Sequence, residues 1–515
     1  MTVNNKLFAA FIALVFTLSS CEKNDTTALP IQPAEAIVPE DIATFTEIAS
    51  IDLGAATAAE ISAYDPSTKK LFVVSNDGGT KVEVLDLSAY PTLTKSKTLL
   101  YPNNAGINSV AVNNGLLAIA LNGITPQSNG DIIVLKTSTL EEVKKIVVGA
   151  MPDMVTFSPD GNYIISANEG EPNDAYTIDP VGSISIIDVK NNYPVKTLDF
   201  AGFESSRTAL VAAGLRIYGV NADGSKASFV QDIEPEYVAV AADSKKAYVT
   251  LQENNAVAEV DLIAGAITKI IPLGVRDISL AENAFDVSDK DSKKQLATWP
   301  IKAYYLPDAI SHFHVNDNNY LALANEGDTR GWTGFNEEVR VKDLILDPVK
   351  FPNAATLKLD ANLGRLTVTK ANGDTDGDSD FDELFSTGGR SVSIINATTG
   401  QLISVIGKDL EQRVIDAGKY DDDRSDNKGV EVEGVTVAQV NGRTLAFIGM
   451  ERVDHIAIYD LTFPSAPKFV QLFATGDAPE GLMFVKAKDS PNGRSLLIVS
   501  NEDDGTVKFF QPNKL

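Results

Sequence analysis

The chain has 515 residues and carries 70 acidic against 44 basic side chains, with one cysteine, three histidines and a formal net charge of −26. A single cysteine excludes an intrachain disulfide framework and a zinc site built on cysteine pairs. A chain this negative is repelled by nucleic-acid phosphates and by anionic lipid surfaces, so we expect no nucleic-acid partner.

The first 20 residues have the pattern of a secretory signal peptide. Lys6 precedes an uncharged apolar run over residues 7–18, which is too short to span a bilayer. The run ends in Leu-Ser-Ser-Cys at 18–21, which is similar to the lipobox of bacterial lipoproteins. We therefore expect residues 1–20 to be a lipoprotein signal peptide and Cys21 to be lipidated. The alternative is an ordinary signal peptide with an incidental cysteine.

Residues 21–40 are rich in proline and in small or polar side chains, which predicts a flexible tether. Together with the signal peptide, the tether predicts a protein of the bacterial cell envelope that is anchored to a membrane by lipid and lies outside the cytoplasm. We expect the lipid anchor to be its contact with the membrane and the folded part, residues 41–515, to be a monomer.

A repeat of about 45 residues runs through this folded part. Each unit has an acidic residue leading into an apolar strand, a turn, a second strand that ends in Asn, Gln or Glu, and a third strand. The clearest unit spans 152–188, and a weaker unit without a leading acid starts near Asn108. The remaining units start at these leading acids: Glu60, Glu236, Asp308, Glu433 and Glu480.

Seven such units predict an all-β fold, a seven-bladed β-propeller whose blades stack around a centre. The last unit lacks a fourth strand, and the apolar segment 45–53 offers one, so we expect the N-terminal strand to close the ring. A pair of β-sandwiches is the alternative.

Some units are longer than the repeat, and the extra length must form large loop insertions on one face, because the first strand of a blade starts at the rim where its second strand ends. The longest insertion, about 328–389, contains alternating oxygen-bearing side chains and one glycine at 377. The spacing is that of an EF-hand calcium loop, although the flanking sequence is β-like. It predicts Ca²⁺ bound by Asn372, Asp374, Asp376, Asp378, Asp380 and Glu383. A solvated acidic loop without an ion is the alternative.

The leading acids and strand-end acids should meet at one rim, where so many carboxylates repel one another unless cations, protons or arginines neutralise them. One interpretation is a site for further divalent metals, with candidate ligands Asp153, Glu169, Glu236, Glu253, Asp308, Glu326, Glu433 and Glu480. Nearby arginines are candidates for binding an anionic substrate, namely Arg330, Arg390, Arg424 and Arg452. The alternative is that these acids and arginines pair as a structural network.

The sequence gives little support for catalysis by histidine. His312 and His314 share one face of a predicted strand, where a metal-binding pair is the alternative to ordinary strand residues. No Gly-x-Ser-x-Gly motif or phosphate-binding P-loop occurs. The sequence identifies no catalytic residue.

Several motifs in one order resemble the choice-of-anchor I family of bacterial secreted or surface-anchored proteins. They include Ala-Asn-Glu-Gly-Glu-Pro at 167–172, Asp-Ile-Glu-Pro-Glu-Tyr at 232–237, Ala-Asn-Glu-Gly-Asp at 324–328 and Arg-Ser-Asp-Asn-Lys-Gly at 424–429. The resemblance implies a β-propeller at the cell surface. Some members of the family are named alkaline phosphatase, which suggests the hydrolysis of phosphoesters. The sequence departs from the family pattern at 431–433 and 453–455.

Taken together, these features predict a lipid-anchored, calcium-binding β-propeller that acts as a metal-dependent phosphoester hydrolase. The alternative is a non-catalytic surface module that recognises a small molecule or a protein on the acidic face.

Overall fold

The computed structural model describes residues 39–221 and 223–515. The predicted signal peptide, Cys21 and nearly all of the predicted tether lie outside these residues. Within the described part of the chain, no helix is both long and apolar enough to cross a membrane.

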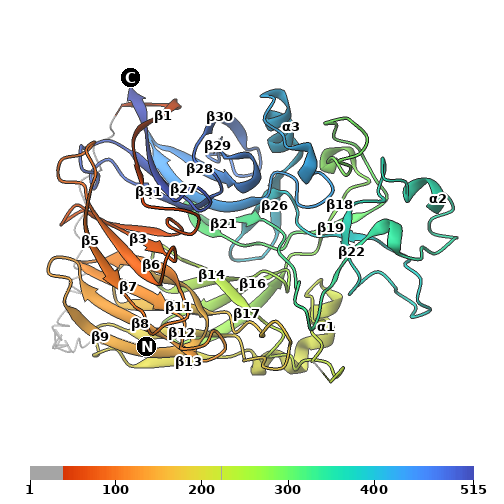
Figure 1. Ribbon diagram of the computed structural model, residues 1–515, viewed down its shortest axis with the longest axis horizontal. Helices are drawn as coiled ribbons and strands as arrows, with labels where there is room; N and C mark the ends of the chain where they lie inside the picture. The colour runs from red at the N-terminus through yellow and green to blue at the C-terminus, as the bar shows by residue number, and fades with distance from the viewer. Residues whose placement is uncertain (1–38, 222) are drawn as a thin grey trace, which may run out of the picture. The chain divides into compact units, whose positions relative to one another are not determined.

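Seven four-stranded antiparallel sheets form the main body of the described chain (Figure 1). In chain order their strands are β2–β5 (Ser62–Asp65, Lys70–Ser75, Lys81–Asp86, Thr94–Leu100); β6–β9 (Ile107–Asn113, Leu116–Leu121, Asn129–Lys136, Glu142–Ala150); β10–β13 (Pro152–Phe157, Tyr163–Asn168, Ser183–Asp188, Val195–Leu198); β14–β17 (Pro235–Val240, Lys246–Leu251, Ala256–Asp261, Ala266–Pro272); β20, β21, β25 and β26 (Ile310–Val315, Asn318–Asn325, Ser391–Asn396, Leu402–Ile406); β27–β30 (Val432–Val440, Arg443–Met450, His455–Asp460, Lys468–Ala474); and β31, β32, β33 and β1 (Pro479–Val485, Leu496–Asn501, Thr506–Lys514, Glu40–Asp52).

The first strands of the sheets form a closed ring. Each contacts the first strand of the next sheet, from β2 through β6, β10, β14, β20 and β27 to β31, which contacts β2 again. Sheets stacked in this way around a centre are the blades of a β-propeller. The predicted fold is therefore confirmed, and the alternative pair of sandwiches is wrong.

Burial follows each strand's place in its blade. The second strands, such as β3, β7 and β11, are buried along almost their whole length because neighbouring blades cover both of their faces, which explains their continuous apolar sequence. The fourth strand β5 is mostly exposed. Between the first two blades, Phe72 and Val84 pack in one core with Leu117 and Ile119.

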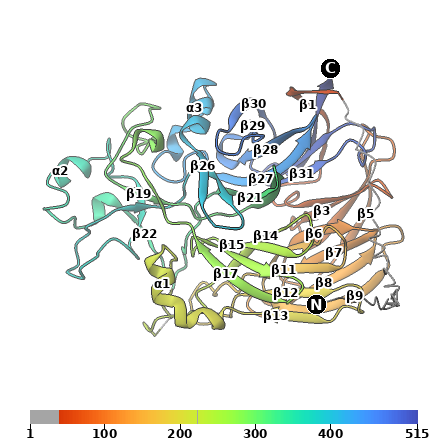
Figure 2. The ribbon, with the colours of Figure 1, turned by 180° about the vertical axis from the view of Figure 1, so that it is seen from behind.

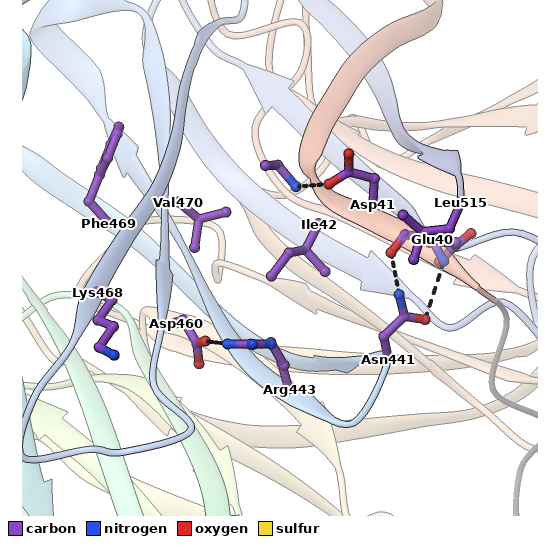
Figure 3. Close-up of a pocket in the computed structure, with 11 residues that line it drawn as sticks. Glu40, Asp41, Ile42, Asn441, Arg443, Asp460, Lys468, Phe469, Val470 and Leu515 are labelled. Atoms are coloured by element: carbon purple, nitrogen blue, oxygen red, sulfur yellow. Dashed lines mark hydrogen bonds and ion pairs between the residues drawn. The ribbon is translucent and has the colours of Figure 1, made fainter.

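The N-terminal strand closes the ring, as predicted. β1 pairs with β33 as the outer strand of the last sheet, with Ile51 opposite Val507. Its backbone is also fastened to the preceding blade, because the side-chain amide of Gln471 accepts from the N–H of Phe45 at 2.9 Å and donates to its carbonyl at 2.8 Å. Figure 3 shows the start of the strand, where Asn441 bonds to both backbone groups of Glu40.

The longest insertion and the segment that precedes the fifth blade together form a separate small sheet. Its strand order is β18, β19, β24, β23, β22 (Val275–Asp277, Lys302–Tyr304, Phe385–Ser386, Thr367–Thr369, Glu338–Arg340). Figure 2 shows β19 and β22 of this sheet on the same side of the molecule as α2 (Ala354–Leu357). A separate hydrophobic core that includes Phe285 and Leu366 holds the two segments together. The other α-helices are α1 (Arg207–Ala212) and α3 (Lys408–Asp416), both between blades.

The closure predicts a position-dependent loss of stability within β1. Phe45 is 1% exposed and packs edge-on against Phe447 at 5.2 Å, whereas Ile48 on the same strand is 44% exposed. Phe45→Ala should lower the free energy of unfolding by about 3 to 5 kcal/mol, and Ile48→Ala by about 0.5 kcal/mol or less. Denaturant titration of both variants tests this, and equal small losses would contradict a closing role for β1.

Candidate metal centre at the channel mouth

Five of the six leading acids, all except Glu60, meet where the first strands begin. Together with strand-end residues they line a cavity of about 250 Å³, which we call the channel mouth. Its acidic lining residues are Asp153, Glu236, Asp308, Glu326, Asp328, Glu433 and Glu480. In the second blade Asn108 lines the cavity in place of an acid. The ring of first strands thus gathers six of the eight predicted metal ligands around one space, and Glu169 and Glu253 are not among its lining residues.

Three of these carboxylates form the tightest set. Ligand oxygens of Asp308, Glu326 and Glu433 all lie within 4.8 Å of one another. Asp308 lies two residues before the hairpin of β20 and β21, and Glu326 directly follows it, so the hairpin returns both side chains to the same rim. Glu433 comes from β27 of the next blade. Three converging carboxylates are a donor set that hard divalent cations prefer.

Several carboxyl groups at the channel mouth are buried without enough hydrogen bonds or positive charges to stabilise their ionised form. Burial raises the pKa of Asp153 to about 6. Burial, followed by the neighbouring carboxylates, raises the pKa of both Asp308 and Glu433 well above its usual value. One buried carboxylate oxygen of each of Glu236, Glu433 and Glu480 has no hydrogen-bond partner. Carboxyl groups in this situation must hold protons or bind cations.

The two members of each Asn-Glu strand end have different roles. The side-chain amide of Asn325 donates to the hydroxyls of Ser391 at 3.0 Å and Ser393 at 2.8 Å, which ties the second strand to the third. Asn168 does the same in the third blade with two serines of β12. The asparagine therefore ties neighbouring strands together, and the glutamate after it supplies a buried carboxyl group whose pKa burial raises.

A cluster of cations lies beside the three-carboxylate set. Lys428 Nζ is 2.7 Å from Glu326, and Glu431 accepts from Arg424 at 2.7 Å and from Arg452 at 2.8 Å. Burial alone would raise the pKa of Glu431, but the three cations together hold it below its usual value. Both arginine side chains remain about one third exposed, at 30% and 35%. They are the predicted anion-binding arginines that keep access to solvent.

The other two predicted anion-binding arginines are used internally. Arg330 is 1% exposed and pairs with Asp232 and, at 2.9 Å, with Glu234. Arg390 is fully buried and donates to the backbone carbonyls of Asp286 and Ser425. Their guanidinium groups face protein acceptors, so we correct the assignment of both residues to a structural role.

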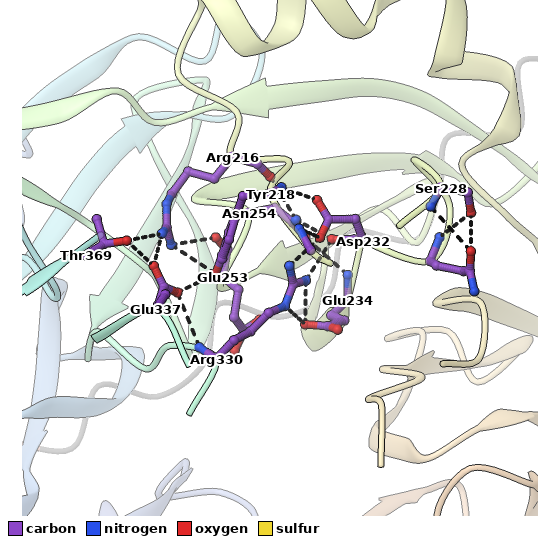
Figure 4. Close-up of polar contacts among 12 residues, drawn as sticks. Arg216, Tyr218, Ser228, Asp232, Glu234, Glu253, Asn254, Arg330, Glu337 and Thr369 are labelled. Carbon is purple, nitrogen blue, oxygen red and sulfur yellow. Dashed lines mark hydrogen bonds and ion pairs between the residues drawn. The ribbon is translucent and has the colours of Figure 1, made fainter. Parts of the chain in front are cut away.

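Arg330 belongs to a buried ionic network that the sequence did not reveal (Figure 4). The ring of Tyr218 lies between the guanidinium groups of Arg216 and Arg330, at 4.2 and 4.7 Å, and its hydroxyl donates to Glu337 at 2.5 Å. Glu337 also pairs with Arg216. The network joins the segment before β14 to the insertion and so fixes the loops that surround the channel mouth.

The acidic loop of the insertion differs in part from the predicted ligand set. Oxygens of Asp374, Asp376 and Asp382 lie within 4.8 Å of one another, and Asp347, Asp380 and Asp382 form a second such group. Asn372 instead contacts Arg216, and Glu383 forms an ion pair with Lys302 at 2.6 Å. Strands β23 and β24 flank the loop in place of the helices of an EF-hand. Asp382 and Asp347 thus belong to these acidic groups, although the spacing did not predict them.

The histidines fit ordinary strand positions. The ring of His312 stacks on Tyr248, and in the described residues no histidine belongs to a group of three potential metal ligands.

The raised pKa values predict an unusual pH dependence of stability. Burial, as the largest cause, raises the pKa of Glu60 and of Glu171 from 4.5 to about 8. The folded protein therefore binds more protons than the unfolded chain between these pH values, so stability must fall as pH rises. In a chelating buffer we expect the melting temperature to decrease from pH 5 to pH 8, and added Ca²⁺ to reduce this decrease. A melting temperature that rises over this range in chelator would contradict the assignment.

Two curated proteins resemble parts of this chain in sequence. Gigasin-3a from Magallana gigas is 29% identical over 190 residues, which cover 30% of this chain and 66% of that protein. The mesenchyme-specific cell surface glycoprotein of Strongylocentrotus purpuratus is 25% identical over 371 residues, which cover 62% of this chain and 46% of that protein. The matched segments thus span about half to two thirds of these curated relatives.

Among solved structures, Kuenenia stuttgartiensis hydrazine synthase matches with a TM-score of 0.49 and 13% identity over 91% of this chain and 99% of that chain. The β-propeller domain of Cps50 (Swd1) from Myceliophteria thermophila matches with a TM-score of 0.46 and 8% identity over the same shares, 91% and 99%. The family model of the choice-of-anchor I domain matches residues 60–464, most of the described chain. The chain therefore belongs to the choice-of-anchor I domain family.

Proposed function

We propose that this surface β-propeller binds a divalent cation at the channel mouth and hydrolyses phosphoesters there. Family membership supports the coarser part of this statement, a β-propeller of the cell surface. The observation that carries the finer part is the convergence of oxygens from Asp308, Glu326 and Glu433 within 4.8 Å in a cavity lined by further acids.

The donor set suits the proposed ion. Asp308, Glu326 and Glu433 offer carboxylate oxygens only, which favours Ca²⁺, Mg²⁺ or Mn²⁺ over metals that prefer nitrogen or sulfur. When bound, such an ion polarises a phosphoryl oxygen and lowers the pKa of a coordinated water. The unpaired carboxylate oxygens of Glu236 and Glu480 are then suited to hold a proton removed from that water.

The cations beside this set would orient the substrate. Arg424 and Arg452 both donate to Glu431 and both remain partly exposed, so each retains N–H groups for a phosphate oxygen. Arg330 and Arg390 support this arrangement from inside the protein, by fixing the loops around it.

A non-catalytic binding module is the second candidate. It is favoured by the pairing of the cations near the channel mouth with carboxylates, since Glu431 already engages both Arg424 and Arg452. A ligand would have to compete with these contacts for the two arginines. Binding alone, without a reaction, would then be the function of the site.

We further propose that the acidic loop binds Ca²⁺ and orders the insertion. Mutual repulsion supports this role, because the charge of Asp378 is the largest cause that raises the pKa of Asp376.

We also propose a lipid anchor for this protein. Residues 1–20 would direct export, and Cys21 would carry the lipid that holds the propeller at a membrane of the cell envelope.

Hydrolysis of a generic phosphomonoester by the purified chain tests the catalytic proposal. We expect turnover with Mg²⁺, Mn²⁺ or Ca²⁺, loss of turnover in chelator, and a decrease of about 100-fold or more in kcat/KM for Glu433→Gln, because a metal ligand matters at least as much as the groups around it. The matched control is Glu259→Gln, which removes a buried carboxylate that pairs with Lys246 at 2.8 Å on β16.

The control should keep the activity of the unmodified chain. Absence of turnover with every ion, together with a cation-dependent rise in melting temperature, would contradict catalysis and favour the binding module. Turnover that survives both chelation and Glu433→Gln would place the reaction outside the channel mouth.

Calcium titration by calorimetry tests the loop. The double variant Asp376→Asn/Asp382→Asn should lower the affinity of one Ca²⁺ site by about tenfold or more, because affinity follows the number of charged ligands. Asp360→Asn is the control in the same insertion, since Asp360 is exposed and, among the ion pairs of the described residues, pairs only with Lys342 at 3.1 Å. Unchanged binding in the double variant would leave the loop as a solvated acidic segment.

A further inference from the structure

Lys428 is held at the channel mouth in the way that a metal ion is held. The residue is 8% exposed, and its ammonium group lies 2.7 Å from Glu326 Oε1, 3.0 Å from Asp328 Oδ1 and 3.2 Å from Glu431 Oε1. An ammonium group has three N–H donors, and here three carboxylates receive them. Buried lysines are rare unless paired, so this environment is built around a positive charge.

One of these carboxylates serves two positions. Glu326 contacts Lys428 and also belongs to the set with Asp308 and Glu433. Its side chain therefore stands between the proposed divalent ion and the ammonium group. In sites with two metal ions, the ions lie about 3.5 to 4 Å apart and stabilise one reacting group between them.

The surrounding charges explain why a cation is needed at this position. The side chains of Glu326 and Glu431 are 12% and 3% exposed, whereas that of Asp328 is 57% exposed. The three carboxylates would repel one another without a cation between them. Arg424 and Arg452 neutralise only Glu431 among these three acids in the ion pairs of the described residues. Without Lys428, Glu326 and Asp328 would lack a cationic partner.

We propose that Lys428 is a tethered cation that fills the second cation position of the channel mouth and so limits the mouth to one divalent ion. This inference rests on the proposed function, because it assumes that Asp308, Glu326 and Glu433 bind the first ion. An anionic substrate would then meet one divalent ion and one ammonium group in place of two metals. Lys428 thus acts as a specificity-determining residue for the number of bound ions.

Calorimetric titration with Mn²⁺, combined with metal analysis after dialysis, tests the inference. The background is the whole chain with Asp374→Asn, Asp376→Asn and Asp382→Asn, which removes the proposed loop site so that the channel mouth is titrated alone. Lys428→Gln removes the charge, Lys428→Arg keeps it, and Lys145→Gln removes a lysine that pairs with Asp131 at 2.9 Å away from the mouth.

We expect one Mn²⁺ per chain in the background protein, in Lys428→Arg and in Lys145→Gln, and two in Lys428→Gln. Saturating Mn²⁺ should also raise the melting temperature of Lys428→Gln by at least twice the rise in the background protein, which keeps the test decisive if the variant is less stable. An equal number of ions and equal temperature shifts in Lys428→Gln and the background would overturn the inference.

Failure of the proposed function has a different signature. A background protein that binds no Mn²⁺ contradicts the divalent site at Asp308, Glu326 and Glu433. The inference about Lys428 instead requires a gain of one ion on removal of its charge, and a gain in Lys428→Arg equal to that in Lys428→Gln would contradict it, because the charge would then be irrelevant.

Discussion

Repulsion among carboxylates at the channel mouth is the constraint on which the rest of this structure depends. The repeat places an acid at the start of nearly every blade, and the closed ring of first strands brings these acids to one cavity. Buried like charges cannot all stay ionised without compensation. The surrounding loops, the internal arginines and the proposed cations can each be understood as a response to this repulsion.

The way in which each acidic side chain is compensated differs between the channel mouth and the loops around it. The innermost acids Glu236, Glu433 and Glu480 have buried oxygens without hydrogen-bond partners. Farther out, Glu431 engages three cations, and Glu234 and Asp232 engage Arg330. Breaking such a buried pair leaves an uncompensated charge, so the outer pairs hold the loops firmly. Of these inner acids, Glu433 belongs to the three-carboxylate set that we propose binds the divalent cation.

Much of the fold could be predicted because the repeat is local in sequence. The leading acids, the continuous apolar second strands and the missing last strand together indicated the propeller and its closure by β1. The same reasoning brought Asp308, Glu326 and Glu433 to one rim, since the two ends of a hairpin must meet.

The details of the site depended on contacts between distant segments, and these have no local signal. Lys428 meets Glu326 across a separation of 102 residues, and Arg330 meets Asp232 across 98. The spacing of the acidic loop suggested Glu383 as a ligand, but Lys302 from another segment of the small sheet pairs with it. Such partners become visible only when the insertion and the segment before the fifth blade are seen to share one sheet.

The central claim is that a divalent cation binds to the carboxylates of Asp308, Glu326 and Glu433 at the channel mouth. X-ray diffraction from Mn²⁺-soaked crystals at a wavelength that reveals the anomalous signal of manganese tests it most directly. The account predicts an anomalous peak within coordination distance of Asp308, Glu326 and Glu433. A crystal in which manganese occupies other positions while these three side chains bond only to one another through shared protons would contradict it.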